Sequence, residues 1–137
     1  MEGFLTEAGV GDDSLFEHIK SFNVSDNIDE SPTLLQRPRI KVFGKECNQN
    51  RNVGFFSDES SGYLYSRQVM VSQKLTPQLK ACLEAINSRY GTNFNGILIN
   101  HYVDGTNYIG KHRDDEQGLD TKRNAVGSIS FGAQRKF

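Results

Sequence analysis

The most informative stretch of the sequence is FNGILINHYVDGTNYIGKHRDDE, residues 94–116. Its apolar run predicts a buried strand over residues 94–103, and the Asp104-Gly105 pair that follows is a turn signal. Residues 108–114 continue as a second strand or as the end of one. The stretch therefore predicts two strands around a tight turn, and polar side chains interrupt both of them.

A polar pair interrupts the first of these strands. Asn100 and Tyr102 are two residues apart, so they share one face of a strand that otherwise carries Ile, Leu and Val. A buried asparagine needs hydrogen-bond partners. The pair therefore either satisfies neighbouring backbone groups or faces a polar ligand. His101 points to the opposite face and is interpreted as a structural or surface residue.

A histidine and an aspartate are two residues apart in the second strand. On an extended segment, His112 and Asp114 point to the same side. An imidazole beside a carboxylate supplies two ligands of the 2-His-1-carboxylate site, which binds Fe(II) and leaves positions open for a cosubstrate and O₂. The H-x-D pattern is short, however, and taken alone its simpler interpretation is an ion pair at the surface.

The remainder of the chain predicts short elements around one clear helix. Thr76 is the expected N-cap of this helix, with Pro77 at its first position and Gly91 closing it. Elsewhere we expect a helix over residues 15–21 capped by Ser14, a polar loop over 22–38, strands from 39, over 52–56 and over 63–71, a charged loop over 115–124 and a strand over 125–131.

Composition excludes several classes of protein. A chain of 137 residues with a net charge of −1 fits one domain and is not a polybasic module that binds nucleic acid by bulk charge. Its acidic N-terminus lacks the features of a secretory signal, and no apolar run is long enough for a membrane helix. The two cysteines, Cys47 and Cys82, are too few for a disulfide scaffold and favour a reducing compartment.

Two longer patterns carry a family resemblance. They are F-N-x-x-L-I-N-x-Y-x-D-G-x-x-x-I-G-x-H-x-D-D-E over residues 94–116 and S-x-S-F-G-A-x-R-x-F over 128–137. Together they resemble the AlkB family of Fe(II)/2-oxoglutarate dioxygenases, and its DNA-repair branch in particular. Shorter segments extend the resemblance back to residue 38, and they are Val42-Phe43-Gly44-Lys45, Arg51, Phe56-Ser57-Asp58 and Tyr63-Leu64-Tyr65-Ser66.

The resemblance implies an α+β fold. We expect a double-stranded β-helix, or jelly-roll, core that follows N-terminal helices, with the C-terminal strands of the core missing. Residues 1–137 would form a single, incomplete dioxygenase domain. Within it, residues 1–37 would be an N-terminal extension, and the nucleotide-recognition region would follow.

The resemblance also assigns roles to single residues. His112 and Asp114 would be Fe(II) ligands, and Asn100 and Tyr102 would hydrogen-bond 2-oxoglutarate. The implied reaction uses O₂ to hydroxylate an N-alkyl group on a base, and the group then leaves as an aldehyde. The residues that would contact the substrate are Phe43, Tyr63, Tyr65, Ser66 and Glu116.

The substrate residues suit a nucleotide that has left the stack, because this chemistry cannot reach a base inside a duplex. Tyr63 and Tyr65 would wall the base pocket, and Glu116 would favour an alkylated base that carries positive charge. Phe43 resembles a hydrophobic finger that fills the gap in the stack. Without the resemblance, Phe43 is a partly buried surface aromatic, Glu116 is part of a solvated acidic run, and Arg51 is one of several basic residues that could meet phosphates.

The sequence departs from the family at the metal site. A second histidine ligand and the arginines that bind 2-oxoglutarate should follow Asp114, but residues 115–137 contain no histidine. His18 and His101 are poor substitutes. We therefore expect the third ligand to be absent, and the chain to be a truncated product, a fragment or an incomplete gene model.

Three functions follow from these observations. The first is a dealkylase that acts on duplex or single-stranded DNA, with RNA as an alternative substrate. The second is an oxygenase with a non-nucleic-acid substrate, and the third is a catalytically incomplete remnant that binds nucleic acid or a partner. The protein is expected to be a monomer without membrane association or secretion, in the nucleus of a eukaryote or otherwise in the cytoplasm.

Overall fold

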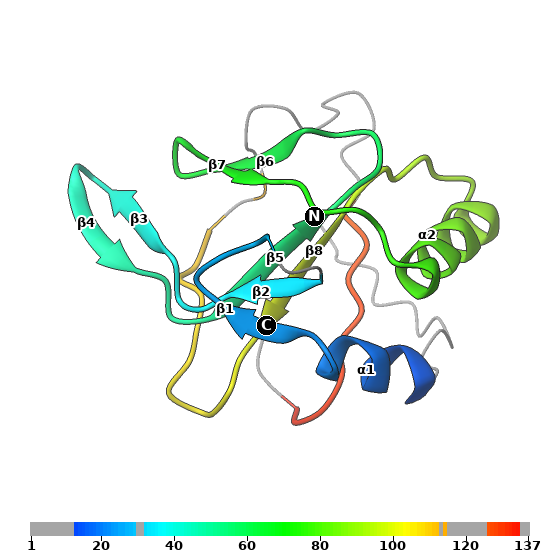
Figure 1. Cartoon of the computed structure of the whole chain (residues 1–137), viewed down its shortest axis with the longest axis horizontal. Helices are drawn as coiled ribbons and strands as arrows, with labels where there is room; N and C mark the ends of the chain where they lie inside the picture. Colours follow the sequence, from blue (N-terminus) through cyan, green and yellow to red (C-terminus); the bar gives the residue numbers. More distant parts are fainter. Residues whose placement is uncertain (1–12, 30–31, 113, 115–125, 135–137) are drawn as a thin grey trace.

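The computed structural model describes residues 13–29, 32–112, 114 and 126–134 of the chain. These residues mix α and β structure, as predicted, with two helices beside a four-stranded sheet and two hairpins (Figure 1). Neither helix combines the length and the apolar character that crossing a bilayer requires.

The main sheet has the strand order β1-β2-β5-β8. β1 (Asn23–Ser25) runs parallel to β2 (Thr33–Leu35), and β5 (Asn52–Phe56) lies antiparallel between β2 and β8 (Ile97–His101). All residues of β5 are buried, so this strand is covered on both faces. The predicted strand over 52–56 is confirmed, whereas the strand predicted over 94–103 is restricted to β8.

Both helices pack on this sheet through a single apolar cluster. They are α1 (Asp13–Lys20), which begins before the predicted cap at Ser14, and α2 (Pro77–Tyr90). Phe131, in the segment coloured red in Figure 1, packs against the cluster and stacks on Phe16 with ring centroids 5.3 Å apart. The buried members of the cluster are Leu15, Phe22, Leu34, Phe56, Leu79 and Ile99.

Helix α2 begins and ends at the predicted residues. Thr76 Oγ1 accepts a hydrogen bond from the Leu79 N–H at 3.3 Å, and Gly91 ends the helix in the left-handed conformation. Thr76 Oγ1 also lies 2.7 Å from Nε2 of His18, so the cap connects α2 to α1. Cys82 packs against the apolar cluster, and burial raises the pKa of its thiol.

Two hairpins lie outside the main sheet (Figure 1). The first joins β3 (Arg39–Val42) to β4 (Lys45–Asn48), and the second joins β6 (Gly62–Tyr65) to β7 (Gln68–Val71). Each has a two-residue turn in which both residues have positive φ, as type I′ turns do. The φ values are 48° at Phe43, 79° at Gly44, 48° at Ser66 and 63° at Arg67.

Several predictions from sequence are wrong in the described residues. The segment 22–38 is more than a loop, because β1 and β2 form there and pair with each other. The stretch 63–71 is a hairpin, since a two-residue turn reverses it. Residues 108–112 and 126–131 form no strand. Alternating apolar residues show which face of an extended segment is buried. A strand also needs a neighbouring strand with which its backbone can form hydrogen bonds, and sequence alternation does not predict that neighbour. The loop predicted over 115–124 lies outside the described residues.

Candidate active site

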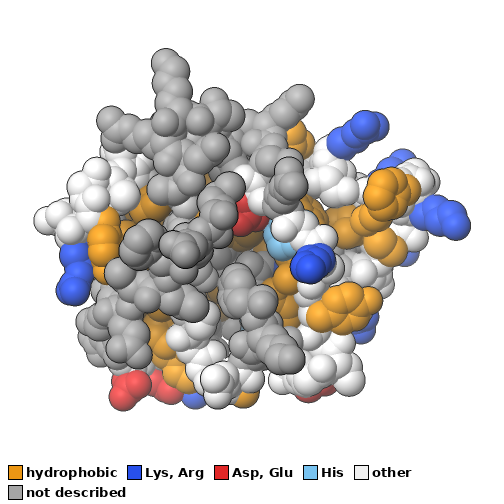
Figure 2. Space-filling model, turned by 180° about the vertical axis from the view of Figure 1, so that it is seen from behind, with side chains coloured by type: hydrophobic (Ala, Val, Ile, Leu, Met, Phe, Trp, Pro, Cys, Tyr) orange, Lys and Arg blue, Asp and Glu red, His pale blue; other side chains and the backbone are white. Residues whose placement is uncertain are grey.

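The structure places the His112 and Asp114 side chains next to each other. His112 Nε2 lies 3.2 Å from Asp114 Oδ1, and the side chains are 36% and 46% exposed. The segment before them is tied to the start of β5, because the Tyr108 N–H donates to the Asn50 carbonyl at 3.2 Å. Figure 2 shows a histidine beside an acidic side chain near the centre of the face seen from behind.

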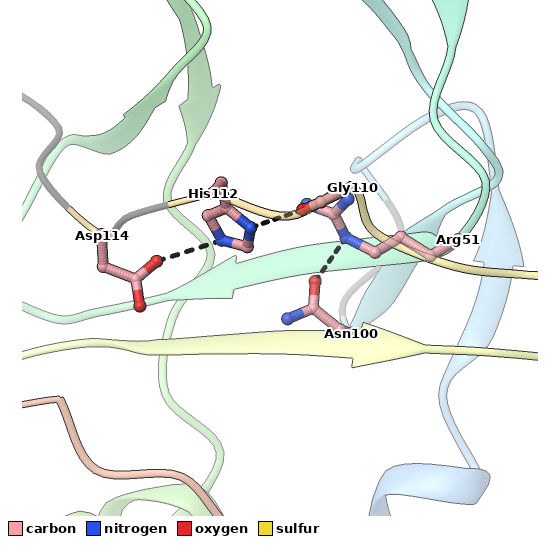
Figure 3. A network of polar contacts seen from close by, with 5 residues as sticks. All are labelled: Arg51, Asn100, Gly110, His112 and Asp114. Carbon is pink, nitrogen blue, oxygen red and sulfur yellow. Dashed lines mark hydrogen bonds and ion pairs between the residues drawn. The ribbon is translucent and has the colours of Figure 1, made fainter. Parts of the chain in front are cut away.

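The second ring nitrogen fixes the orientation of His112. Its Nδ1 lies 2.8 Å from the carbonyl oxygen of Gly110 (Figure 3), and a carbonyl only accepts hydrogen bonds. Nδ1 therefore carries a proton, and Nε2 faces the Asp114 carboxylate. A lone pair and a carboxylate oxygen at this distance repel each other unless a cation, either a proton or a metal ion, lies between them. Metal-binding histidines are oriented in this way by a carbonyl acceptor.

Arg51 also belongs to this region, although the sequence indicated no role for it beyond the family resemblance and a possible phosphate contact. It is 4% exposed, and its Nε donates to Asn100 Oδ1 at 2.7 Å (Figure 3). Its guanidinium also lies over the ring of Tyr65, 5.3 Å from the centroid. An arginine directly before the apolar strand 52–56 was the available signal, because a charged side chain there must find internal partners.

Asn100, near the end of β8, and Tyr102, just after it, are less buried than the sequence predicted. Asn100 is exposed, so the expectation of a buried asparagine is wrong, and its oxygen is satisfied by a side chain rather than by backbone. Tyr102 is half-buried and follows the last residue of β8. His101 is exposed, with its Nδ1 3.4 Å from Asn52 Nδ2, in agreement with its interpretation as a surface residue.

The two tyrosines of β6 lie against β5 and the residue that precedes it. The Tyr63 ring lies 5.6 Å from the ring of Phe55, and Tyr65 lies against Arg51. Both are half-buried, and their spacing gives them one face of the strand, as expected. Tyr65 therefore connects, through Arg51, to Asn100.

The other substrate residues proposed from sequence lie in the hairpin turns or outside the described part. Phe43 sits at the tip of β3–β4 with its whole side chain exposed, so the interpretation as a partly buried aromatic is wrong. A two-residue turn, rather than a strand, carries it, and no core lies within its reach. Ser66 donates its hydroxyl to the Lys41 carbonyl. Glu116 lies outside the described residues.

The described residues bring together two side chains, His112 and Asp114, of types that can bind a metal ion. They contain no cluster of three or more His, Cys, Asp or Glu side chains that could hold one. His18 is engaged in the cap of α2, and His101 contacts Asn52. One imidazole nitrogen and one carboxylate oxygen, held close together at the surface, are the donor types that Fe(II) takes in 2-His-1-carboxylate sites, so His112 and Asp114 fit this metal.

Comparison with known proteins identifies the family. A sequence profile of the 2OG-Fe(II) oxygenase superfamily matches residues 17–137. The chain is 35% identical to the human protein DNA oxidative demethylase ALKBH2 over 99 residues, which are 72% of this chain and 38% of the human protein. It is 34% identical to the Arabidopsis thaliana protein of that name over 105 residues, 74% of this chain and 33% of the relative. The chain thus spans less than half the length of these curated relatives.

The chain therefore belongs to the 2OG-Fe(II) oxygenase superfamily and, through its similarity to the ALKBH2 proteins, to the AlkB family within it. The family resemblance seen in the sequence patterns is confirmed. Members of this superfamily are dioxygenases, and the superfamily implies Fe(II) as the metal cofactor and 2-oxoglutarate and O₂ as cosubstrates.

Proposed function

We propose that this protein takes part in the oxidative dealkylation of N-alkylated bases in DNA, and so in DNA repair. The observation that carries the proposal is the His112–Asp114 pair, whose imidazole is oriented by Gly110, in a chain of the AlkB family. Similarity to proteins named DNA oxidative demethylase supports DNA as the substrate.

In this proposal, His112 Nε2 and Asp114 Oδ1 hold Fe(II). Asn100 and Tyr102 hydrogen-bond 2-oxoglutarate. Because Asn100 Oδ1 already accepts a hydrogen bond from Arg51, the N–H groups of its amide are the donors that face the cosubstrate. Arg51 thereby orients Asn100 and is part of the site.

Bound Fe(II) supplies the activation of O₂ against 2-oxoglutarate and the alkyl C–H bond. One oxygen atom would enter 2-oxoglutarate, which would lose CO₂ and become succinate, and the other would be inserted into the C–H bond. The four electrons that O₂ takes up come equally from these two oxidations. The N–CH₂OH group would then break at its C–N bond: the bonding electron pair would return to the base nitrogen, formaldehyde would leave, and, for a cationic alkylated base, the hydroxyl proton would pass to water.

The substrate residues extend the proposal to the nucleotide. Tyr63 and Tyr65 stack on the flipped base, a contact that contributes about 1–3 kcal/mol for an aromatic side chain. Glu116 would lie near the base, whereas Ser66, whose hydroxyl donates to the Lys41 carbonyl, would lie beside the pocket without contacting the base. Phe43, exposed at its hairpin tip, enters the gap in duplex DNA. Single-stranded DNA and RNA are alternative substrates of the same pocket.

The architecture and location of the protein belong to the same proposal. The main sheet would be part of a double-stranded β-helix core, and residues 1–137 would belong to a single dioxygenase domain with an N-terminal extension over 1–37. The protein would act as a monomer, in the nucleus if the source is a eukaryote.

The test is turnover by the purified chain with Fe(II), ascorbate, 2-oxoglutarate and a duplex that contains N1-methyladenine. Loss of the methyl group and formation of succinate are both measured. A version extended through the downstream gene sequence is assayed in parallel, and His112→Ala serves as the matched inactive variant of each.

Repair by either version that disappears in the variant supports the proposal. Repair by the extended version alone would mean that the third ligand comes from that extension. Succinate formation without methyl loss would favour an oxygenase with another substrate. Absence of both activities in both versions would favour the binding remnant and overturn the proposal.

A further inference from the structure

A hydrogen bond joins the two hairpins. The Ser66 hydroxyl, in the turn of β6–β7, donates to the backbone carbonyl of Lys41 in β3. Ser66 is half-buried, and Lys41 is two residues before Phe43 at the tip of its own hairpin. The bond therefore connects the hairpin that carries Tyr63 and Tyr65 to the base of the Phe43 turn.

Serine is an unusual residue for this turn position. Both turn residues of β6–β7 are in the left-handed region, with φ of 48° at Ser66 and 63° at Arg67. Asparagine, aspartate and glycine take this conformation most easily. A strained residue persists where surrounding contacts hold it in place. Here that contact is the bond to Lys41, which gives the serine hydroxyl a role that a glycine could not fill.

The same two hairpins line one cavity of about 430 Å³. Ile40 of β3, Tyr65 of β6 and Met70 of β7 contribute to its walls. An isolated two-stranded hairpin is marginally stable, so contacts outside the hairpin set its orientation. A rotation of either hairpin across this cavity would change the distance between the Phe43 tip and the tyrosines.

We propose that Ser66 is a positioning residue that holds the Phe43 tip at a set place relative to Tyr63 and Tyr65, and thereby favours duplex over single-stranded substrates. This inference rests on the proposed function. In a duplex, the gap must be filled while the base is captured, so the relative position of finger and tyrosine wall matters. A single strand has no continuous stack to fill, and only the tyrosine wall is used.

The first experiment tests the positioning without nucleic acid. The chain contains no tryptophan, so Phe43→Trp introduces a single probe at the hairpin tip. In this background we compare Ser66→Ala and Ser66→Gly with Ser60→Ala, whose hydroxyl donates within its own loop to the Gly62 carbonyl at 2.9 Å. Loss of the Ser66 hydroxyl should lower the fluorescence anisotropy of the tip, whereas Ser60→Ala should not change it.

The second experiment measures affinity with Phe43 restored. Binding of each Ser66 variant to an N1-methyladenine oligonucleotide is compared for the duplex and for the same strand alone. Loss of one hydrogen bond should weaken duplex binding by about 3- to 10-fold and leave single-strand binding within about 2-fold. In a Phe43→Ala background, Ser66→Ala should have no further effect on duplex binding, because the finger through which it acts is absent.

The outcomes separate this inference from the proposed function. Unchanged anisotropy in both Ser66 variants, or full recovery in Ser66→Gly, would overturn the positioning role, because backbone strain rather than the hydroxyl would then matter. Equal loss of affinity on both substrates would mean that Ser66 contacts the base directly, and would also overturn it. Failure of the unmodified protein to prefer a methylated oligonucleotide would count against the proposed function and the duplex preference, while the anisotropy still decides the positioning.

Discussion

At the scale of single residues, the buried charge of Arg51 depends on a neutral partner. Its Nε donates to Asn100 at 2.7 Å, and its guanidinium lies over the ring of Tyr65. No carboxylate among the described residues forms an ion pair with it. A hydrogen bond from a charged donor contributes about 1.5–3 kcal/mol, so the exposed Asn100 matters more for stability than its exposure indicates.

We therefore expect Asn100→Ala to lower the free energy of unfolding by about 1–2 kcal/mol, measured by urea denaturation. Asn100→Asp keeps an acceptor for the guanidinium and should remain closer to the unmodified protein. Asn93→Ala, at an exposed asparagine after α2, is the matched control. Equal effects of Asn93→Ala and Asn100→Ala would contradict the role of the Arg51 contact.

At the scale of elements, the first turn of α2 also stabilises its contact with α1. Thr76 Oγ1 accepts from the Leu79 N–H and contacts His18. Thr76→Ala removes both interactions and should reduce stability by about 1–2 kcal/mol, seen as a lower midpoint of thermal unfolding. Thr76→Ser keeps the hydroxyl and should lose much less. Similar losses in the two variants would assign the effect to the methyl group instead of the cap.

The two cysteines should differ in reactivity because their elements bury them differently. Cys47 is exposed on β4, whereas burial in α2 raises the pKa of Cys82. Since the thiolate is the reactive form, a disulfide reagent at pH 8 should label Cys82→Ala rapidly and Cys47→Ser slowly. Equal rates would show that α2 does not protect its thiol.

The same shift gives stability a pH dependence with a defined sign. The unfolded thiol of Cys82 ionises near its ordinary pKa of about 8.5, while the folded thiol keeps its proton to higher pH. Ionisation therefore favours the unfolded chain, and this contribution to stability, complete at neutral pH, is lost as the pH rises through the alkaline range. Cys82→Ala should remove that part of the alkaline loss in urea denaturation.

At the scale of the whole molecule, β5 lies between two strands, and its central residue, Gly54, has no space for a larger side chain. A Cβ added at Gly54 would lie 2.9 Å from Leu34 Cδ2 and 3.0 Å from the Thr33 carbonyl oxygen in β2. Gly54→Ala should therefore destabilise the protein by about 1–3 kcal/mol in urea denaturation. Gly105→Ala meets nothing within 4 Å and is the control. A neutral Gly54→Ala would mean that β2 moves freely away from β5.

Sequence predicted the elements that local signals define. Thr76, Pro77 and Gly91 define α2 by capping chemistry, and the turn signal of residues 57–62 marks the end of β5. It missed β1 and β2, which are three-residue strands formed through pairing with distant segments. The sequence also contains no sign of the β6–β7 hairpin, because Ser66 and Arg67 are not typical residues of its two-residue turn.

In the candidate site, too, a local pattern predicted some residues, whereas strand pairing placed others. The H-x-D spacing in the sequence pointed to His112 and Asp114, whereas the contacts of Arg51 depend on the register of β5 with β8. That register pairs Val53 with Asn100. Arg51, two residues before Val53, therefore lies close enough to donate to Asn100. Such pairing is a property of the assembled sheet, and no local pattern reports it.

Under the proposed function, the fully exposed ring of Phe43 also has a consequence for the protein between encounters with DNA. Moving a phenylalanine side chain out of water contributes about 1.5–3 kcal/mol, and separating two stacked bases costs a few kcal/mol. Burial of the ring in the duplex would therefore offset part of the cost of opening it. This gain is not selective, because any apolar surface that covers the ring provides the same free energy of burial. Crowding of the protein with its own copies would thus compete with DNA for the same contact.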